Sequence, residues 1–443
     1  MKKVLSILGI IITFYILYFL QINFFSWFNI AGVKPNLFIV LILCLGLFIG
    51  KNMAMIIGFI MGIYLDILTG KQIGIYSIML VVIGFCGGYF DKNFCLIKIY
   101  KSMKKNLLLG IVLTLLLVLT SCKKQELYAK TYFEYFDTVI TISGYEENKE
   151  EFTNSLKLIE PLLEKYHKLY DIYYEYSGVN NICTVNKKAY LEPVKVDIEI
   201  INMLEYGFNM YDKTNGMLNI AMGSVLRLWH DERDYASEYP SEAKLPNMDK
   251  LLEASNYMNI NDVVIDKENS TIFIKNEYTK LDVGSIAKGY VCEQIAKVLI
   301  ENNVTSYILN LGGNIKLLGT KPKGKDFNVG VQNPTSNDNS IVLSLKDYSI
   351  VTSGSYQRYY MVDGVSYHHI INPKTLMPEN NFLSVTIVSK DSTLCDCLST
   401  ALFNMTIDEG KEILNKFEDT YAMWIDKNNN ITYSEGFSNF INN

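Results

Sequence analysis

The sequence lacks a strong excess of charge of either sign. Its 443 residues include 41 lysine and arginine residues and 46 aspartate and glutamate residues, which gives a formal net charge of −5. No dense basic stripe with interleaved aromatic residues follows residue 122. Proteins that bind nucleic acids usually show such a stripe, because it neutralises phosphate charges. We therefore expect no nucleic-acid partner.

The sequence also lacks the cysteine pattern of a disulfide framework. Its eight cysteines are scattered, and three of them lie in or beside apolar segments before residue 96. Cys395 and Cys397 are separated by one residue, a spacing that suits neither a zinc site nor a redox pair. We expect the cysteines to pack as small hydrophobic residues. Cys122 is the exception.

The hydrophobic residues are unevenly distributed along the chain. They make up 49% of it, but their excess lies before residue 122, whereas the remainder alternates charged, polar and tyrosine residues as soluble domains do. The length allows two or three domains, each with its own core. We therefore divide the chain into a membrane part and a globular part.

Four apolar segments occupy the membrane part. Each is near the length that crosses a bilayer as a helix, and together they cover residues 4–20, 37–50, 53–68 and 73–89. Lysines precede the first segment and follow the fourth, so the positive-inside rule places both ends of the block in the cytoplasm. Residues 1–94 are therefore predicted to form an all-α, multi-pass region of the cell membrane with four transmembrane helices.

Residues 1–94 resemble the rod shape-determining MreD family, which implies a role in cell shape. The resemblance rests on residues 34–37 (Lys-Pro-Asn-Leu), on the run from Gly62 to Gly70, and on later glycines. It stops early, because a complete member would have further spans. Glycine spacing in membrane helices commonly serves helix packing. Asp66 is either a functional intramembrane acid or a residue near the end of a loop.

An export signal is predicted inside the chain. Residues 103–106 form a basic n-region that begins with methionine, residues 107–119 form an apolar h-region, and residues 119–122 (Leu-Thr-Ser-Cys) resemble a bacterial lipobox. In lipoproteins the cysteine receives lipid after cleavage before it, which implies a mature chain anchored at Cys122. The alternative is a fifth transmembrane helix with an incidental cysteine.

Either interpretation carries the chain after residue 123 across the membrane. The predicted domains are thus a membrane region at residues 1–94, a linker and lipoprotein signal peptide at 95–122, and an extracytoplasmic globular domain at 123–443. The complete signal that begins at Met103 also suggests two adjacent genes joined by a lost stop codon or a reading-frame error.

The globular domain is predicted to be α+β. Apolar periodicity predicts helices at residues 152–170, 198–213 and 286–301, and strands at 138–143, 262–265, 271–274, 307–311 and 383–388. The helices and strands follow one another unevenly, without a βαβ repeat. This order favours an α+β fold over a doubly wound sheet.

The first candidate motif runs from residue 281 to 290 and reads Leu-Asp-Val-Gly-Ser-Ile-Ala-Lys-Gly-Tyr. The end of a strand with a carboxylate is followed by small residues that lead into a helix. Backbone N–H groups at the start of such a helix, together with Lys288, could hold a phosphate group. The alternative is that Asp282 only caps the helix and that Gly284 only permits a turn.

Two further motifs contain glycines and histidines. The Gly-Gly pair at 312–313 follows a strand and lets the backbone approach a ligand or turn in a hairpin. His368 and His369 are two of the four histidines in the chain. Histidine is the usual side chain for proton transfer near neutral pH, although a single histidine more often has a structural role. We interpret His167 and His230 as structural.

The fourth motif covers residues 391–402. If it forms a helix, Asp396 and Thr400 stand one turn apart on the same face and could offer a carboxylate and a hydroxyl to one hard cation. Mg²⁺ suits such ligands, with phosphate oxygens completing its shell. The alternative is a surface aspartate beside a threonine that bonds to its own helix.

Together these motifs resemble the ApbE family of FAD:protein FMN transferases over residues 128–435. The family's motifs fall at residues 282–290, 310–313, 352–356, 368–373 and 396–400, whereas residues 136–138, 216–219 and 373–378 depart from its pattern. The resemblance implies transfer of FMN from FAD to a threonine hydroxyl of an acceptor protein, with release of AMP. The acceptor would carry a Ser/Thr-Gly-x-Thr motif and belong to a membrane electron-transfer protein.

The resemblance also implies the site residues. Magnesium would be held by Ser285, Asp396 and Thr400 together with FAD phosphates. FAD would be contacted by Asp282, Lys288, Tyr176, Phe136, Leu218, Asn219, Ile220 and Ile370. His369 is the candidate general base, because an unperturbed imidazole pKa of about 6.5 leaves enough neutral form; His368 is the fallback.

Three other functions stay open at this point. The same site could hydrolyse FAD to FMN and AMP with water in place of threonine. The domain could instead be a flavin-binding lipoprotein without catalytic activity. Finally, the membrane region could define the biology as a component of cell-shape maintenance.

Overall fold

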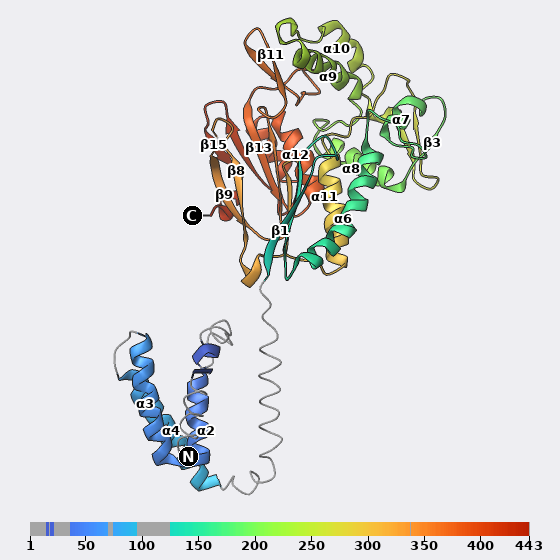
Figure 1. Cartoon of the computed structure of the whole chain (residues 1–443). Helices are drawn as coiled ribbons and strands as arrows, with labels where there is room; N and C mark the ends of the chain where they lie inside the picture. Colours follow the sequence, from blue (N-terminus) through green and yellow to red (C-terminus); the bar gives the residue numbers. More distant parts are fainter. Residues whose placement is uncertain are drawn as a thin grey trace. The chain divides into compact units, whose positions relative to one another are not determined.

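A computed structural model describes residues 15–16, 18–21, 36–69, 74–94, 125–336 and 338–442. The chain forms two compact units, Met1–Cys122 and Lys123–Asn443, which are drawn in Figure 1. Each unit is described by itself. The export signal predicted at residues 103–122, with Cys122, lies outside the described residues.

The described part of the N-terminal unit is helical. Its longer helices are α2 (Leu37–Ile49), α3 (Lys51–Thr69) and α4 (Ile75–Phe94), which follow the second to fourth apolar segments of the sequence. Over the residues described, we find no helix that is both long enough and apolar enough to cross a membrane. The first predicted segment lies largely outside those residues.

The helices of this unit pack closely through small residues. A Cβ atom on Gly62 would lie 2.3 Å from the Cα atom of Ser77, so glycine spacing here serves helix packing. Asp66 is buried, and its Oδ2 accepts hydrogen bonds from the Gly74 N–H (2.9 Å) and the Ser77 hydroxyl (2.8 Å). Its carboxylate therefore stabilises the start of α4, which explains its burial without a functional role.

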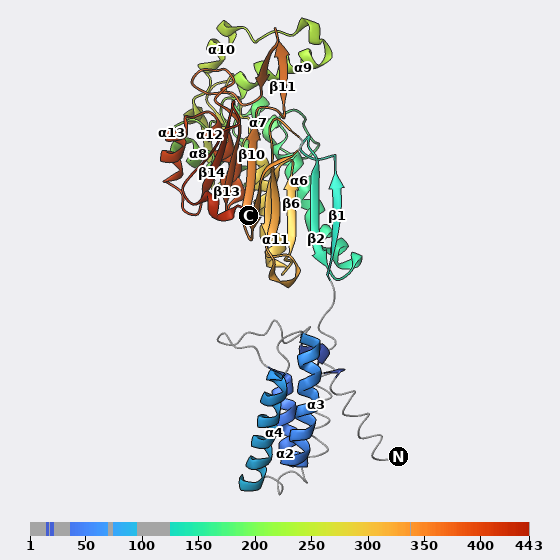
Figure 2. The same cartoon turned by 90° about the vertical axis from the view of Figure 1, so that its left-hand side faces the viewer.

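The C-terminal unit is built on one eight-stranded sheet in which all neighbouring strands are antiparallel. Figure 2 shows most of the strands side by side. In spatial order they are β1 (Glu126–Tyr132), β2 (Ile140–Glu146), β6 (Tyr307–Leu311), β7 (Asn314–Leu318), β10 (Ser349–Gly354), β13 (Phe382–Ser389), β14 (Tyr421–Asp426) and β15 (Ile431–Tyr433).

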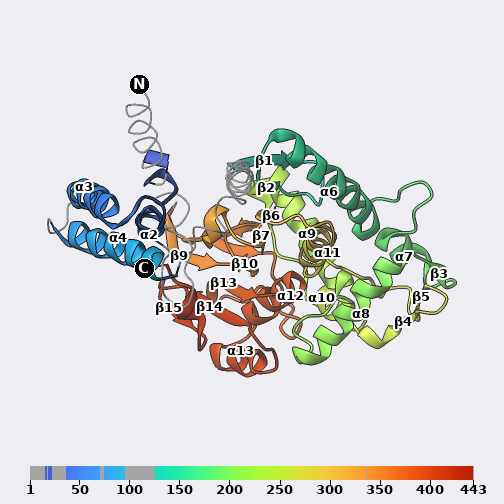
Figure 3. The same cartoon turned by 90° about the horizontal axis from the view of Figure 1, so that it is seen from below.

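Both faces of this sheet are covered. On one face lie the helices α6 (Lys149–Tyr170), α11 (Ala287–Glu301) and α12 (Ser392–Phe403), and on the other lies the hairpin of β8 (Phe327–Gln332) and β9 (Asn339–Leu345). Figure 3 shows the sheet between them. The strand period of two explains this layering: Ile387 packs toward the helices, whereas Val388 packs toward the hairpin.

The remaining elements surround the helical face. They are α7 (Ile182–Lys188), α8 (Ile198–Lys213), α9 (Gly223–Glu238), α10 (Met248–Ser255), α13 (Ile407–Leu414), a small sheet of β3 (Val194–Lys195), β5 (Thr271–Ile274) and β4 (Val263–Asp266), and a hairpin of β11 (Tyr359–Val362) and β12 (Val365–His368). Short 3₁₀ turns occur at Pro240–Glu242, Ile260–Asp262, Pro322–Gly324 and Phe437–Phe440. Helix α9 packs against the β11–β12 hairpin through Trp229 and Tyr360.

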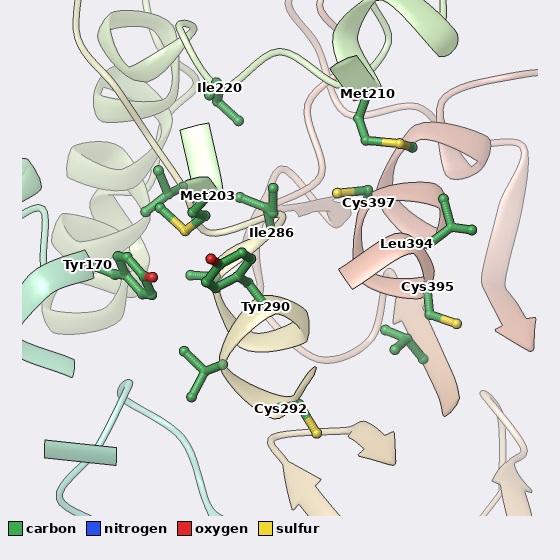
Figure 4. Close-up of a cluster of buried hydrophobic side chains, with 14 of the residues drawn as sticks. Tyr170, Met203, Met210, Ile220, Ile286, Tyr290, Cys292, Leu394, Cys395 and Cys397 are labelled. Atoms are coloured by element: carbon green, nitrogen blue, oxygen red, sulfur yellow. The ribbon is translucent and has the colours of Figure 1, made fainter. Parts of the chain in front are cut away.

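Four of the six described cysteines are buried as the sequence predicts, whereas Cys44 and Cys86 are half-buried. Cys183, Cys292, Cys395 and Cys397 are free and buried. Figure 4 shows the last three among the apolar side chains of α11 and α12. Burial raises the pKa of the Cys292 thiol to about 12, so this thiol stays protonated and unreactive at neutral pH.

The hairpin between β6 and β7 gives a test of packing. It turns at Gly312 and Gly313, with φ values of 60° and 90°. A Cβ atom on Gly312 would lie 2.2 Å from Oγ1 of Thr138, whereas one on Gly313 would have no heavy atom within 4 Å. We expect Gly313→Ala to lower the free energy of unfolding by about 1–2 kcal/mol through backbone strain, and Gly312→Ala by a further 1–3 kcal/mol or so, because Thr138 must move.

Urea unfolding of the two variants measures this difference, and Gly313→Ala is the matched control for strain alone. Equal destabilisation of both would show that the contact with Thr138 contributes nothing.

Candidate functional site

The site begins where α11 and α12 approach each other. A Cβ atom on Gly289, in the first turn of α11, would lie 2.4 Å from the carbonyl oxygen of Ser392 and 2.6 Å from Cβ of Asp396. Glycine is therefore needed for this close approach. It brings the Asp396 carboxylate of α12 to the N-terminus of α11.

Asp396 is held at this helix end by several groups. Its side chain is buried, with the residue 4% exposed, and Oδ2 accepts a hydrogen bond from the Gly289 N–H at 2.8 Å. Oδ1 lies 3.4 Å from Nδ2 of Asn314 and 4.0 Å from Nζ of Lys288. The positive end of the α11 dipole stabilises a carboxylate here.

The atoms around Asp396 fit a small, hard cation. Asn314 is 1% exposed, and its Oδ1 atom is buried without a hydrogen-bond partner among the described residues. Thr400 is half-buried one turn after Asp396 on α12, and Ser285 lies just before α11. Carboxylate, amide and hydroxyl oxygens are the ligands that Mg²⁺ prefers. In the described part of the chain, no three histidine, cysteine or acidic side chains converge on a common metal position.

Asp282 does not cap α11. The helix has Ile286 at its N-cap position, without a side-chain hydrogen bond, whereas Oδ1 of Asp282 accepts from the Gly284 N–H at 2.9 Å. The strand expected before Asp282 is a single bridge, at Lys280. Burial raises the pKa of Asp282, although the hydrogen bond from Gly284 and the charge of Lys288 oppose this effect. Nζ of Lys288 donates to the Gly284 carbonyl oxygen at 3.3 Å, so Asp282 and Lys288 both bond to the backbone of Gly284.

His369 follows the β11–β12 hairpin and is fixed by the backbone of Arg358. Both the N–H group (3.0 Å) and Nδ1 (3.2 Å) of His369 lie within hydrogen-bond distance of the Arg358 carbonyl oxygen. Because a carbonyl can only accept, Nδ1 carries the proton and Nε2 presents its lone pair.

The environment also keeps His369 neutral. Burial lowers the pKa of the imidazole to about 3, and the positive charges of Arg358 and Arg233 act in the same direction. The sequence-based expectation of a pKa near 6.5 was therefore wrong, because it took no account of burial and of two nearby arginines.

His368 uses both of its ring nitrogens for structure. Nε2 donates to the Glu379 carbonyl oxygen at 2.7 Å, and Nδ1 accepts from the Ile370 N–H at 3.2 Å. The ring is buried, which lowers its pKa. With neither nitrogen free, His368 is unsuited to the fallback role of general base. Ile370 itself is only 4% exposed and belongs to the core.

The loop before β2 has strained backbone geometry. Phe136 and Asp137 have φ values of 57° and 48°, a region that side-chain-bearing residues seldom occupy and that recurs at functional sites. The Phe136 N–H donates to Nδ1 of His167 at 3.2 Å, and Tyr176 lies on the other side of the same imidazole. The two predicted flavin contacts, Phe136 and Tyr176, therefore flank one residue.

The segment 218–220 is buried instead of exposed to a ligand. Leu218 and Ile220 are 1% and 0% exposed, and the Asn219 side chain bonds to backbone groups of Met258 and Ala221. The Ile220 carbonyl accepts the Asp282 N–H at 2.9 Å. The backbone of Ile220 therefore supports Asp282, and the side chains of Leu218 and Ile220 lie in the hydrophobic core, where they are nearly inaccessible.

The comparison with known proteins now decides the family. The ApbE family model matches residues 136–425. The chain belongs to the ApbE family. The FAD:protein FMN transferase of Treponema pallidum is 31% identical over 271 residues, which are 58% of this chain and 73% of that relative. The enzyme of the same name from Klebsiella pneumoniae is 28% identical over 276 residues, 62% of this chain and 82% of the relative.

Solved structures confirm the α+β fold of this ApbE-family domain. The crystal structure of an ApbE protein from Thermotoga maritima superposes with a TM-score of 0.64 at 26% identity, covering 72% of this chain and all of that one. The flavin transferase ApbE from Vibrio cholerae gives a TM-score of 0.60 at 22% identity, over 71% and 99% of the two chains.

A second family model, rod shape-determining protein MreD, matches residues 1–140. This match confirms the resemblance seen in the sequence and indicates membrane association. It extends beyond the boundary predicted at residue 94, and it overlaps the ApbE match over residues 136–140.

Sequence reasoning missed two arginines of the ApbE-family domain. Arg233 of α9 is half-buried and forms no ion pair with a carboxylate among the described residues. Its positive charge acts on the pKa of both Asp282 and His369. Arg358 donates from Nη2 to the Asp137 carbonyl oxygen at 3.1 Å. The spacing of Trp229 and Arg233 by one helical turn is the signal that could have indicated Arg233.

Proposed function

We propose that residues 123–443 catalyse the magnesium-dependent transfer of FMN from FAD to a threonine hydroxyl of an acceptor protein, with release of AMP. The main support is the junction of α11 and α12, where the buried Asp396 carboxylate and the Asn314 amide oxygen, which has no partner among the described residues, offer oxygen ligands to a cation. His369, whose Nδ1–H is bonded to the Arg358 carbonyl, adds an Nε2 atom that can accept a proton. The names of the relatives, FAD:protein FMN transferase, agree with the proposal.

The metal is assigned to the junction of α11 and α12. Asp396, Thr400 and an oxygen of Ser285 would hold Mg²⁺, and Asn314 positions Asp396 through Nδ2. When bound, the ion would offset negative charge on the FAD pyrophosphate and on the AMP that leaves. The neighbouring Lys288 and the unpaired Arg233 supply further positive charge for the phosphates.

His369 is assigned the proton transfer. The threonine oxygen attacks the phosphorus atom on the FMN side, the bond from this phosphorus to the AMP oxygen breaks, and the hydroxyl proton passes to Nε2 of His369. The hydrogen bond from Nδ1–H to the Arg358 carbonyl keeps the imidazole in the tautomer that this step requires. AMP leaves with the electron pair of the broken bond.

The test uses residues 123–443, because the three hydrophobic clusters described after residue 131 consist only of residues from this part of the chain. The protein is incubated with FAD, Mg²⁺ and an acceptor carrying a Ser/Thr-Gly-x-Thr motif, and the acceptor is weighed by mass spectrometry. We expect an adduct with the mass of FMN and an equal amount of AMP. AMP with free FMN and no adduct would identify a hydrolase instead, and flavin binding without AMP would identify a binding module.

Arg233 gives a prediction on substrate affinity. We expect Arg233→Met to raise KM for FAD about tenfold or more, because a hydrogen bond between charged groups contributes about 1.5–3 kcal/mol. Arg227→Met is the matched control on the same helix, since Arg227 is exposed and paired with Asp231 at 2.7 Å. Steady-state kinetics measure both variants. If Arg233→Met leaves the KM for FAD unchanged, Arg233 does not bind the phosphates.

For the N-terminal unit we propose a place in the membrane and, from the MreD match, a role in cell shape. Support comes from the helices of this unit, which carry apolar residues on their inner and outer faces. Ile42 and Leu80 are buried between the helices, whereas Ile60 and Ile78 on the outside are 62% and 69% exposed. Such outer faces suit lipid better than water. An acceptor in the same membrane would meet an enzyme held close to it.

We further propose that Cys122 carries a lipid and that the catalytic unit lies outside the cytoplasm. The lipobox-like sequence before Cys122 supports this assignment. Metabolic labelling with a fatty acid should mark the wild-type chain and leave Cys122→Ala unlabelled. Equal labelling of both would exclude this cysteine as the anchor.

A further inference from the structure

The strained loop at Phe136 and Asp137 is fixed from three directions. The Phe136 N–H donates to His167 of α6 (3.2 Å), and the Asp137 carbonyl accepts from Nη2 of Arg358 (3.1 Å). The Val139 carbonyl accepts from the Gly312 N–H (3.1 Å). Left-handed conformations persist only where the surroundings enforce them, so these contacts hold the backbone of the loop that carries the Phe136 ring.

His167 makes two different hydrogen bonds at once. Because the Phe136 N–H is a donor, Nδ1 must be the acceptor, which leaves the proton on Nε2. Nε2 lies 3.3 Å from the Tyr176 hydroxyl, which itself donates to Oδ2 of Asp171 at 2.7 Å. A single neutral tautomer of His167 therefore satisfies the whole chain of contacts, with Nε2–H donating to the tyrosine oxygen.

The aromatic rings on both sides of the imidazole face it edge-on. The ring centroids of Phe136 and Tyr176 lie 5.6 and 6.1 Å from that of His167, at interplanar angles of 80° and 64°. The imidazole belongs to α6, a 22-residue helix that packs on the sheet. One rigid residue thus sets the distance and direction of two half-buried aromatic side chains.

The same loop leads to the candidate base. Arg358 bonds to the Asp137 carbonyl through its side chain, and its own carbonyl accepts both hydrogen bonds of His369. The contacts of His167, the loop at 136–137 and Arg358 therefore form a continuous path from the two aromatic rings to His369.

We propose that His167 is a positioning residue that holds Phe136 and Tyr176 as a preformed aromatic wall for the isoalloxazine ring of FAD. This inference rests on the proposed function and deepens it. Planar aromatic ligands stack on aromatic side chains, and a wall that is already in place avoids the cost of ordering it when the ligand binds. His167 acts through its neighbours and touches neither the phosphates nor the proton that is transferred.

Two polar replacements separate the two hydrogen bonds of His167. In His167→Asn the amide oxygen can replace Nδ1 as the acceptor for the Phe136 N–H, whereas in His167→Gln the amide nitrogen can replace Nε2 as the donor to Tyr176. His167→Phe removes both. The dissociation constant of FAD, measured by flavin fluorescence quenching, and the visible spectrum of bound FAD are the readouts.

We expect His167→Phe to weaken FAD binding about tenfold, with each polar replacement giving a smaller loss, since two hydrogen bonds of about 0.5–1.5 kcal/mol each are involved. The spectrum of bound flavin should shift, while kcat at saturating FAD should change less than about threefold. Tyr176→Phe should weaken binding in the wild-type chain and add little to His167→Phe, because the two residues act together.

Folded variants with unchanged FAD affinity and an unchanged flavin spectrum, even with a lower melting temperature, would overturn the proposal. If His167→Phe does not fold, His167→Gln and Tyr176→Phe carry the same test. FAD affinity is measured without an acceptor, so a wild-type chain that binds FAD but forms no adduct contradicts the proposed transfer and still decides the role of His167.

Discussion

Replacing His369 with alanine should reduce FMN transfer by about a hundredfold to ten-thousandfold, the usual contribution of a general base, while FAD still binds. The reason is that Nε2 of His369 presents a lone pair fixed by the Arg358 carbonyl. Transfer is measured as the FMN adduct on the acceptor, and binding as flavin fluorescence quenching. Added imidazole should restore part of the activity, which would separate a lost base from a distorted site.

The pH dependence of the same step tests the electrostatics around His369. Burial and neighbouring charge lower the pKa of His369 to about 3, so the imidazole of the free enzyme stays unprotonated above about pH 5. Protonation of His369 should therefore cause no decrease of kcat/KM between about pH 5 and pH 8. The phosphates of bound FAD favour the protonated imidazole, so an acid limb in kcat should lie at higher pH than one in kcat/KM.

Two results would contradict this account of His369. Transfer by His369→Ala within tenfold or so of wild type would remove the residue from the proton transfer, given the size that such a base contributes. An acid limb of kcat/KM near pH 6.5 that disappears in His369→Gln would show that the imidazole has an ordinary pKa in the free enzyme.

Replacing Asp396 with asparagine should abolish the response to magnesium. The amide keeps the shape of the side chain and can still accept the Gly289 N–H, but it removes the negative charge that a divalent cation needs. At limiting Mg²⁺ we expect activity to fall by about a hundredfold or more, as for the loss of several kcal/mol of metal stabilisation. The concentration of Mg²⁺ that stabilises the FAD complex in thermal melts should rise in parallel.

Asp391→Asn is the control on the same helix. Asp391 is the N-cap of α12 and accepts from the N–H groups of Thr393 and Leu394, and asparagine serves almost as well at this position. It should therefore keep the magnesium response. If Asp396→Asn shows wild-type turnover at limiting Mg²⁺, the metal assignment fails.

The longer amphipathic elements were predictable because their burial is periodic. The helix predicted at residues 152–170 is found as α6, and the strand predicted at 383–388 as β13. Helix α9 was not predicted. Its run from Asp231 to Asp234 consists of charged residues, so its apolar stripe reduces to a few side chains such as Trp229. The β11–β12 strands, of four residues each, were not predicted either.

The candidate site was predictable where residues follow one another on a helix. Asp396 and Thr400 lie on one face of α12 because helical spacing alone requires it. Contacts between distant segments could not be derived in this way. The low pKa of His369 comes mainly from burial, with smaller effects of Arg358 and of Arg233, which is distant in sequence. Ile220 packs against α8, where a Cβ atom on Gly207 would lie 2.8 Å from its Cδ1 atom. Tertiary packing decides such properties.

The separation of the hydrophobic cores has a consequence for processing of the chain. Each described cluster lies within one unit: one in the helices before residue 95, and three after residue 131. Because each described cluster is built from residues of one unit, we expect the catalytic unit to stay folded after cleavage before Cys122. If a signal peptidase cleaves the chain before Cys122, as proposed, the products would be a folded catalytic unit and a separate helical unit.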